Sequence, residues 1–455
     1  MSEENGMKYD VGDKPPFKEN LVCALQQFLA ISAATILVPL IVDPTGEYLN
    51  MASALIGAGF GTIVYLLFTQ FKSPVFLGSS FAFIGPLFMA IGCGFFGLII
   101  GALVACLVYV LIAVIVLAGG IRWINKYLPP IVIGPTVALI GFFLAGTAMT
   151  YVMYNEYNSA LPTASYNMFA IILGLFAFMV IAYTSVRARS SIRMYPFIVG
   201  IAVGYVAALI LTGIGMATGI QDLQLIDFSP FEKIGDFNNW IPQLTFVGLL
   251  GQDLSAVDMS KIVTIIVAYF VTAFVVFTEH LGDHKNISSI LKRNLFADPG
   301  LHRTLVGDGV GSFVGAIFGG VPNTTYGESI GCVALSKNAS TRTILLTAFI
   351  CIVVAFIYPI VVFVETLPWC VIGSTCIALY GFISVSGLRM LSGVELMDPR
   401  NLYVVAAVFI CGLGGLYFDF GGGVVIDSLA PALIVGIITN IVMKNHLMNP
   451  ELEEA

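Results

Sequence analysis

The sequence predicts an all-α polytopic membrane protein with fourteen membrane-crossing segments, arranged as two inverted halves of seven segments each. The first observation is composition: 58% of the 455 residues are hydrophobic and only 10% are charged, whereas soluble domains carry about 25% charged residues. The second is a series of apolar stretches long enough to cross a bilayer. The third is an internal repeat that relates the two halves of the chain.

Twelve apolar stretches are predicted to form full spanning helices, because about 20 apolar residues are needed to cross the hydrocarbon core. They cover 21–42, 49–70, 95–119, 128–151, 166–185, 195–218, 260–281, 303–320, 341–364, 369–388, 402–418 and 425–443. Two further stretches, 75–92 and 321–337, are too short or too interrupted to form regular spans. The longest connection, 219–259, is acidic and moderately apolar, and we interpret it as an external segment at the membrane surface.

Basic residues indicate the orientation of the chain. The polar segment 1–20 lacks the apolar core of a cleaved signal peptide, so the first apolar stretch is expected to remain as a helix. If 1–20 is cytoplasmic and both interrupted stretches cross the membrane, 18 of the 20 Lys and Arg residues are cytoplasmic, leaving Lys233 and Lys261 outside. If the two interrupted stretches instead entered and left the membrane on the same side, the later loops would change sides and this bias would be lost. We predict a multi-pass protein of the cell membrane, plasma or inner, with cytoplasmic tails 1–20 and 444–455.

Two sequence matches relate the halves. The sequence "SSFA" at 79–82 matches "TTYG" at 324–327, at an offset of 245 residues. The sequence "LPPIVIGPTVALIG", which begins at Leu128, matches "LPWCVIGSTCIALYG", which begins at Leu367, at an offset of 239 residues. Because each half has an odd number of crossings, the second half is inverted relative to the first, as in many secondary transporters.

We predict two short antiparallel β-strands at the interrupted segments 3 and 10. The stretches "VFLGSSFAF" and "NTTYGES" are rich in β-branched, hydroxyl and glycine residues, which disfavour helix. Unpaired backbone in hydrocarbon costs several kcal/mol per group, and pairing the two strands removes this cost. A half-helix after each strand would then point its free N–H groups at the centre of the membrane. Paired interrupted segments predict a binding site near the midplane.

Five motifs carry a family resemblance. They are "KPPFKENLVCALQQFLAISAATILVP", "LGSSFAFIGP", "EHLGDH", "DPGLHRTLVGDG" and "PNTTYGESIG". From about Lys14 to Lys444 the chain resembles the nucleobase/ascorbate transporter family, and "PNTTYGE" is most similar to its uracil permease branch.

The resemblance implies a core domain of segments 1–4 and 8–11 and a gate domain of segments 5–7 and 12–14. In this sequence the core domain covers 21–120 and 260–364, and the gate domain covers 121–218 and 365–443, with 219–259 as the external loop. The resemblance also implies proton-coupled uptake of uracil by alternating access, and a homodimer.

Two acidic residues in apolar surroundings are the first candidates for the site. Glu279 ends a long apolar run, and a carboxylate inside a membrane is a functional candidate by default; alternatively, it marks a helix end clear of the lipid. Glu328 alternatively serves only the dipole of its helix. The resemblance implies that both bind the nucleobase by accepting hydrogen bonds from it. A base without a matching donor would leave a buried carboxylate unpaired, which costs about 1–3 kcal/mol or more.

The resemblance implies four further binding residues. Phe81 would donate its backbone N–H to a uracil carbonyl, and Gly327 would present its backbone to the base at close range. Tyr326 corresponds to Phe81 in the repeat, and Ala34 would lie beside the base. The alternatives are core packing for Phe81 and ordinary helix packing for Ala34.

Coupling to protons is predicted from three residues. Asp283 lies four residues after Glu279, on the same helix face, where the uracil branch often carries His. Two adjacent carboxylates resist simultaneous ionisation and so favour proton uptake, and His280 lies nearby. The same carboxylates could hold Na⁺, so the coupling ion stays open between H⁺, which we favour, and Na⁺. Two further departures from the family, Ser329 for Asn and Gln27 for His, are expected to tune substrate choice.

We do not expect this protein to be an enzyme, and we expect no metal site, no cofactor and no nucleic-acid partner. The eight cysteines form no CxxC motif and lie mostly in apolar stretches, as small buried hydrophobes do. The expected partners are a small nucleobase, membrane lipid and a second copy of the chain. Two alternatives remain: another base, such as xanthine or thymine, or an anion carrier or channel on the same inverted-repeat fold. We expect an anion carrier to place a cation or neutral donors, rather than two acids, at the centre.

Overall fold

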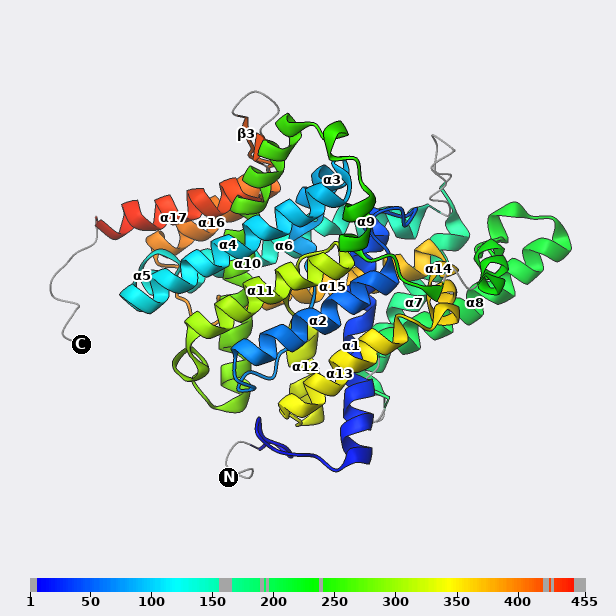
Figure 1. The fold of residues 1–455 in the computed structure, drawn as a ribbon, viewed down its shortest axis with the longest axis horizontal. Coiled ribbons are helices and arrows are strands. Elements are labelled where there is room, and N and C mark those ends of the chain that lie inside the picture. The colour runs from blue at the N-terminus through cyan, green and yellow to red at the C-terminus, as the bar shows by residue number, and fades with distance from the viewer. Residues whose placement is uncertain are drawn as a thin grey trace.

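The chain forms a bundle of helices with two small sheets (Figure 1). The computed structural model describes residues 6–154, 166–188, 192–193, 196–236, 240–419, 425–426 and 429–445. In Figure 1 the helices near the C-terminus, α16 and α17, lie at one end of the molecule, and α7 and α8 lie at the other.

The helices follow the apolar stretches of the sequence. Their bounds are α1 Phe17–Val42, α2 Met51–Phe68, α3 Ile84–Ile91, α4 Gly94–Gly119, α5 Arg122–Tyr127, α6 Pro130–Met153, α7 Met168–Arg187, α8 Pro196–Thr218, α9 Thr245–Gly251, α10 Met259–Leu291, α11 Leu301–Gly319, α12 Gly327–Ser336, α13 Thr341–Val354, α14 Tyr358–Glu365, α15 Trp369–Arg389, α16 Pro399–Leu413 and α17 Leu429–Asn445. The strands are β1 Leu77–Ser79, β2 Asn323–Thr325, β3 Phe418–Asp419 and β4 Val425–Ile426, and a 3₁₀ turn, η1, covers Phe81–Phe83.

Eight helices of the described chain are long and apolar enough to cross a membrane, and the bent pair α13 and α14 would make a ninth span if it crosses as one unit. The eight are α1, α2, α4, α6, α7, α8, α10 from Lys261, and α15. Helices α16 and α17, together with the segment Phe81–Ile91, are apolar but shorter. The predicted class of mostly helical polytopic membrane protein is therefore confirmed.

Three predicted boundaries are wrong. The single helix expected over 341–364 breaks between α13 and α14 with a bend of 81°, because Pro359, in the first turn of α14, has no N–H to donate to Ala355 and its ring clashes with that carbonyl group. The glycine-rich stretch after α16 ends that helix at Leu413 and leads into the β3–β4 hairpin, instead of continuing the helix to residue 418. Helix α10 continues ten residues beyond the predicted end at 281.

The helices pack in two groups. One group contains α1, α2, α4, α10, α11 and α13, and the other contains α6, α7, α8, α15, α16 and α17. The closest packing in the first group joins α2 to α11, and that in the second joins α6 to α15. The groups meet where α10 contacts α6 and α17, and where α1 contacts α8.

Glycines bring α2 and α11 into backbone contact. A Cβ atom on Gly57 would lie 2.4 Å from the carbonyl oxygen of Gly315, and one on Gly61 would lie 2.6 Å from that of Gly311. The Asn323 side chain enters the same seam and donates from Nδ2 to the Gly57 carbonyl oxygen at 3.0 Å. Small residues allow such close approach of membrane helices, and here they fix strand β2 against α2.

The N-terminal segment is ordered against the ends of two helices. The Ala339 N–H, just after α12, donates to the carbonyl oxygen of Tyr9 at 2.9 Å. Asp10 accepts a hydrogen bond from the guanidinium of Arg293, which follows α10. The segment predicted as a simple tail therefore ties together the ends of the two helices that carry Glu279 and Glu328.

Candidate functional site

Strands β1 and β2 lie side by side next to the site. They pair antiparallel, with Leu77 opposite Thr325 and Ser79 opposite Asn323. The Ser80 N–H donates to the Pro322 carbonyl oxygen at 2.9 Å and extends the pairing. All six strand residues are buried. The predicted antiparallel strands at the two interrupted segments are confirmed.

Neighbouring side chains hold strand β1 in place. The Thr62 hydroxyl of α2 both accepts from the Leu77 N–H, at 2.9 Å, and donates to the Leu77 carbonyl oxygen, at 3.1 Å. The Tyr326 hydroxyl donates to the Ser79 carbonyl oxygen at 2.9 Å. Its ring lies on Gly78, where a Cβ atom would come within 2.4 Å of the ring. These contacts satisfy backbone groups that have no helical partner.

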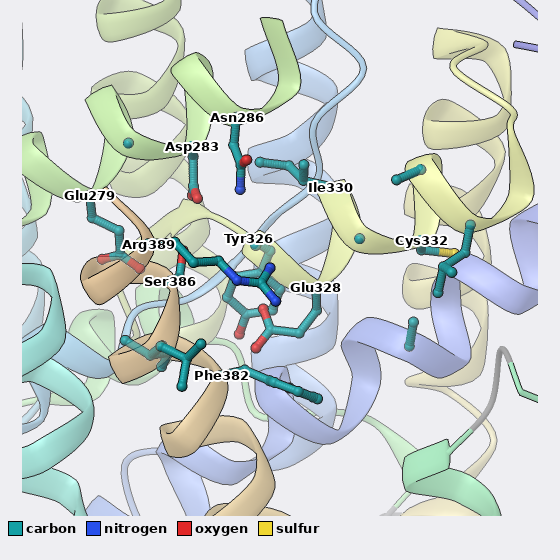
Figure 2. Close-up of a pocket in the computed structure, with 18 of the residues that line it drawn as sticks. Glu279, Asp283, Asn286, Tyr326, Glu328, Ile330, Cys332, Phe382, Ser386 and Arg389 are labelled. Atoms are coloured by element: carbon teal, nitrogen blue, oxygen red, sulfur yellow. The ribbon is translucent and has the colours of Figure 1, made fainter. Parts of the chain in front are cut away.

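A cavity of about 620 Å³ opens beside the paired strands β1 and β2. Six of the predicted site residues line it: Phe81, Glu279, Asp283, Tyr326, Gly327 and Glu328. Figure 2 shows Glu279, Asp283 and Asn286 projecting from α10, and Glu328 from the start of α12, into this cavity. Its volume falls within the range of about 300–1,000 Å³ typical of small-molecule sites.

Helix α10 turns one polar face toward the cavity. Glu279, Asp283 and Asn286 line it and are spaced at four and three residues, so they share one helix face. Asp283 is buried, and its Oδ2 accepts from the Thr325 hydroxyl at 2.7 Å. The alternative that Glu279 ends its helix is wrong, because α10 continues to Leu291.

The start of α12 forms the facing wall. Glu328 is the second residue of α12, so its position fits both a binding role and interaction with the helix dipole. A Cβ atom on Gly327 would meet only the Asp283 Oδ1, at 3.8 Å. A side chain at Gly327 would therefore enter open cavity space. The first turn of a helix also leaves backbone N–H groups without helical partners, and α12 and η1 both begin at this cavity.

Two predicted site residues lie elsewhere. Ala34 is fully buried in the core, and Ala30, one turn earlier on α1, lines the cavity instead. His280 faces α11: its Nδ1 lies 2.6 Å from Asp308 Oδ2, and its Nε2 lies 3.1 Å from the Thr304 hydroxyl. The structure thus places His280 outside the cavity lining.

The cavity also contains residues that the sequence analysis missed. Arg193, Asn286, Ser386 and Arg389 line it, together with apolar residues that include Phe382. Asn286 lies seven residues after Glu279, so the helical period could have identified it. The arginines were counted only as cytoplasmic charges, because nothing in the sequence indicates that α15 ends beside α10.

The two departures from the family pattern contact each other. The Ser329 hydroxyl accepts from the Gln27 Nε2 of α1 and from the Phe76 N–H at 3.1 Å. Gln27 Nε2 also donates to the Ser329 carbonyl oxygen at 3.2 Å. Both side chains are buried, and their hydrogen bonds join α1, α12 and the residue before β1. In the described parts of the chain, no group of three or more His, Cys, Asp and Glu side chains is arranged to hold a metal ion.

A polytopic bundle with a cavity beside two paired, interrupted segments is typical of membrane transport proteins. Residues 18–419 match the family described as the permease family, and the chain belongs to this family. It is an integral membrane protein of the transporter class.

Curated relatives cover nearly the whole chain. The uracil permease of Bacillus caldolyticus is 34% identical over 95% of this chain and 94% of its own length. The uracil permease of Bacillus subtilis (strain 168) is 34% identical over 92% of this chain and 91% of its own length. The uracil permease of Escherichia coli (strain K12) is 30% identical over 95% of this chain and 93% of its own length.

Solved structures share the fold at low sequence identity. The transmembrane domain of the cyanobacterial bicarbonate transporter BicA matches with a TM-score of 0.61 and 15% identity, covering 95% of this chain and all of that domain. SLC26A9 matches with a TM-score of 0.59 and 13% identity, covering 94% of this chain and 66% of its own. At such identities the likeness concerns the fold alone.

Proposed function

We propose that this protein takes up uracil together with protons across the cell membrane by alternating access. One observation carries the proposal: a single cavity contains Glu279 and Asp283 of α10 and Glu328 of α12, beside the starts of η1 and α12. The curated names of the relatives support uracil as the substrate.

The chemistry of the cavity suits a pyrimidine. Uracil offers two ring N–H donors and two carbonyl acceptors. Glu279 and Glu328 supply the acceptors, and the N–H groups at the starts of η1, at Phe81, and α12, at Gly327, supply the donors. Tyr326 contributes through packing, because its hydroxyl already bonds to Ser79. Ala34, which does not line the cavity, contributes to the proposed site by packing in the core.

The fourteen-segment inverted repeat and its division into core and gate domains belong to the same proposal. Three pairings support it: β1 with β2, α2 with α11, and α6 with α15. Each pair takes one element from each half of the chain, as a two-fold relation between the halves requires. The two packing groups correspond to the proposed core, 21–120 and 260–364, and gate, 121–218 and 365–443. Assembly as a homodimer is also proposed.

The described conformation is proposed to face the cytoplasm. Away from the strands, the cavity is lined by Arg193, Asn286, Ile290 and Arg389. All four lie near helix ends that the distribution of basic residues places on the cytoplasmic side. The outward-facing state would require the core group to move relative to the gate group.

The proposal is tested with purified protein in proteoliposomes. We expect uptake of radiolabelled uracil to accelerate under an inward proton gradient and to be competed away by excess unlabelled uracil. Competition by thymine, xanthine and bicarbonate determines the specificity. Uptake that ignored pH but required a Na⁺ gradient would reject proton coupling and favour the Na⁺ alternative. No saturable uracil uptake under any gradient would reject the substrate.

Asp283→Asn is expected to separate binding from coupling. Asn keeps an oxygen that can accept from the Thr325 hydroxyl, so the strand–helix contact survives, but it cannot take up a proton. We expect the uracil Kd to change by less than about threefold, which corresponds to under about 0.7 kcal/mol. Acceleration of uptake by a proton gradient should disappear. Asp258→Asn, in the external connection, is the control; equal loss of coupling in both variants would contradict the assignment.

Gly327→Ala is expected to weaken uracil binding without destabilising the fold. The added methyl group meets only Asp283 Oδ1 at 3.8 Å, so it projects into the space reserved for the base. We expect at least a tenfold higher Kd, about 1.4 kcal/mol, with an unchanged melting temperature. Gly146→Ala, on α6 and outside the cavity lining, where a Cβ atom meets nothing within 4 Å, is the matched control. Binding of unchanged affinity by Gly327→Ala would place the base elsewhere.

A further inference from the structure

A second cavity lies on the other side of Phe81. It measures about 180 Å³. Its lining includes Phe81, Ile140, Ala268 and Thr272, and the other described lining residues are apolar side chains or glycine. Of the described residues, Phe81 alone lines both this cavity and the larger one.

The two cavities lie at different heights along α10. The second cavity touches α10 at Ala268 and Thr272, whereas the larger one touches it from Glu279 to Ile290. Seven residues separate Thr272 from Glu279, which is about 10 Å along a helix axis. Helix α6 shows the same division, with Val137 in the larger cavity and Ile140 in the second. Phe81 therefore lies between two successive compartments at the contact of the two helix groups.

The Phe81 side chain lies where the two cavities adjoin and contacts the second helix group. Phe81 starts η1, directly after strand β1, and is 8% exposed. Its ring packs edge-on against Tyr380 of α15, with centroids 5.5 Å apart and planes at 78°. This contact joins one helix group to the other, so a relative movement of the groups would separate the rings.

We propose that the second cavity is a separate station, that is, a second binding position, for a small neutral planar ring. The Phe81 side chain is the gate between this cavity and the larger one. The inference rests on the proposed function and adds a compartment and a side-chain role to it. The ligand class follows from the lining: the described residues there include no ionisable side chain, and Thr272 supplies the single hydroxyl. An ion would lose its hydration without compensation in such surroundings. The volume suits one ring, because drug-sized ligands need about 300–1,000 Å³.

A thiol-labelling experiment tests the gating role of Phe81 without requiring transport. Cys332, which lines the larger cavity, is first replaced by Ala, and a cysteine is introduced as Thr272→Cys. A small thiol reagent that does not cross lipid is added to the face onto which the larger cavity opens. We expect labelling of this cysteine to be at least tenfold faster with Phe81→Ala than with Phe81 intact, and Phe81→Leu to stay slow. Ser386→Cys, in the larger cavity, is the control and should label equally in all three backgrounds.

Two results would contradict the role of Phe81 as a gate. One is equal labelling of the cysteine at position 272 with Phe81 intact and with Phe81→Ala. The other is a rise of the same size for the cysteine at position 386, which would indicate general loosening of the protein. If Phe81→Ala does not fold, as size-exclusion chromatography would reveal, Phe81→Val replaces it and must meet the same criterion. Because labelling needs no uracil, a failure of the proposed substrate leaves this test intact.

The station itself is tested by filling it. Ala268→Phe places a ring into the second cavity without touching the larger one. We expect uracil uptake from the face nearer the second cavity to fall at least tenfold, while equilibrium binding of uracil to the purified protein stays unchanged. Uptake from that face at the parent rate would show that the cavity is only a packing void. Loss of binding together with uptake would also contradict a separate station.

Discussion

Replacing Glu328 with Gln is expected to weaken uracil binding about 10- to 150-fold. Glu328 lines the cavity at the second position of α12 and offers a carboxylate to a ring N–H of the base. A hydrogen bond to a charged group is worth about 1.5–3 kcal/mol, and each 1.4 kcal/mol corresponds to a tenfold change in Kd. Glu279→Gln, which changes the carboxylate on α10, should have an effect of similar size.

The measurement is equilibrium binding of radiolabelled uracil to purified protein. Glu232→Gln, at an exposed position of the external connection, is the matched control and should bind like the parent. A Glu328→Gln variant with unchanged affinity would remove this carboxylate from the site and leave it as a partner of the helix dipole. An equal loss in the control would point to the quality of the purified protein instead.

Replacing Gly57 with Val is expected to disrupt the packing of α2 against α11. The Cβ atom alone would lie 2.4 Å from the carbonyl oxygen of Gly315, and a backbone oxygen cannot swing aside as a flexible side chain can. Overpacking typically costs about 1–3 kcal/mol and occasionally more, and this seam also holds Asn323 of strand β2. We expect a lower melting temperature and a larger aggregated fraction.

Thermal unfolding in detergent and size-exclusion chromatography measure this effect. Gly213→Val on α8 is the control, because it introduces the same β-branched residue in a spanning helix where a Cβ atom meets nothing within 4 Å. A Gly57 variant as stable as the Gly213 variant would show that α2 and α11 can separate without loss. Weakened uracil binding in a folded Gly57→Val protein would show that the seam transmits strain to β2.

The break between α13 and α14 could have been predicted, whereas the arrangement of the cavity could not. Pro359 lies within the stretch predicted as one helix, and a proline inside an apolar run signals a kink. In contrast, the sequence places Arg389 only at the end of a helix. That Arg389 lines the same cavity as Glu328 depends on how α15 packs, and side-chain period along one helix carries no information about the neighbouring helix.

His280 and Tyr326 show the same limit at the level of single residues. The helical period separates His280 from the face of Glu279 and Asp283, but only the packing of α10 against α11 gives it Asp308 as a partner. The repeat identified Tyr326 as the counterpart of Phe81. That its hydroxyl bonds to Ser79 rather than facing the cavity follows from its ring lying on Gly78 of the opposite strand.

The class of protein, the positions of most long apolar helices and the two interrupted segments with paired strands follow from the sequence alone. These properties depend on local features: the length of apolar stretches against the thickness of a bilayer, and backbone preferences of residues next to one another. Tertiary packing selects which faces of α10, α12 and α15 enclose the cavity, which polar groups already have partners, and that Phe81 lines both cavities. Those properties depend on contacts between segments about 300 residues apart, such as Gln27 with Ser329, and close packing rather than local preference selects them.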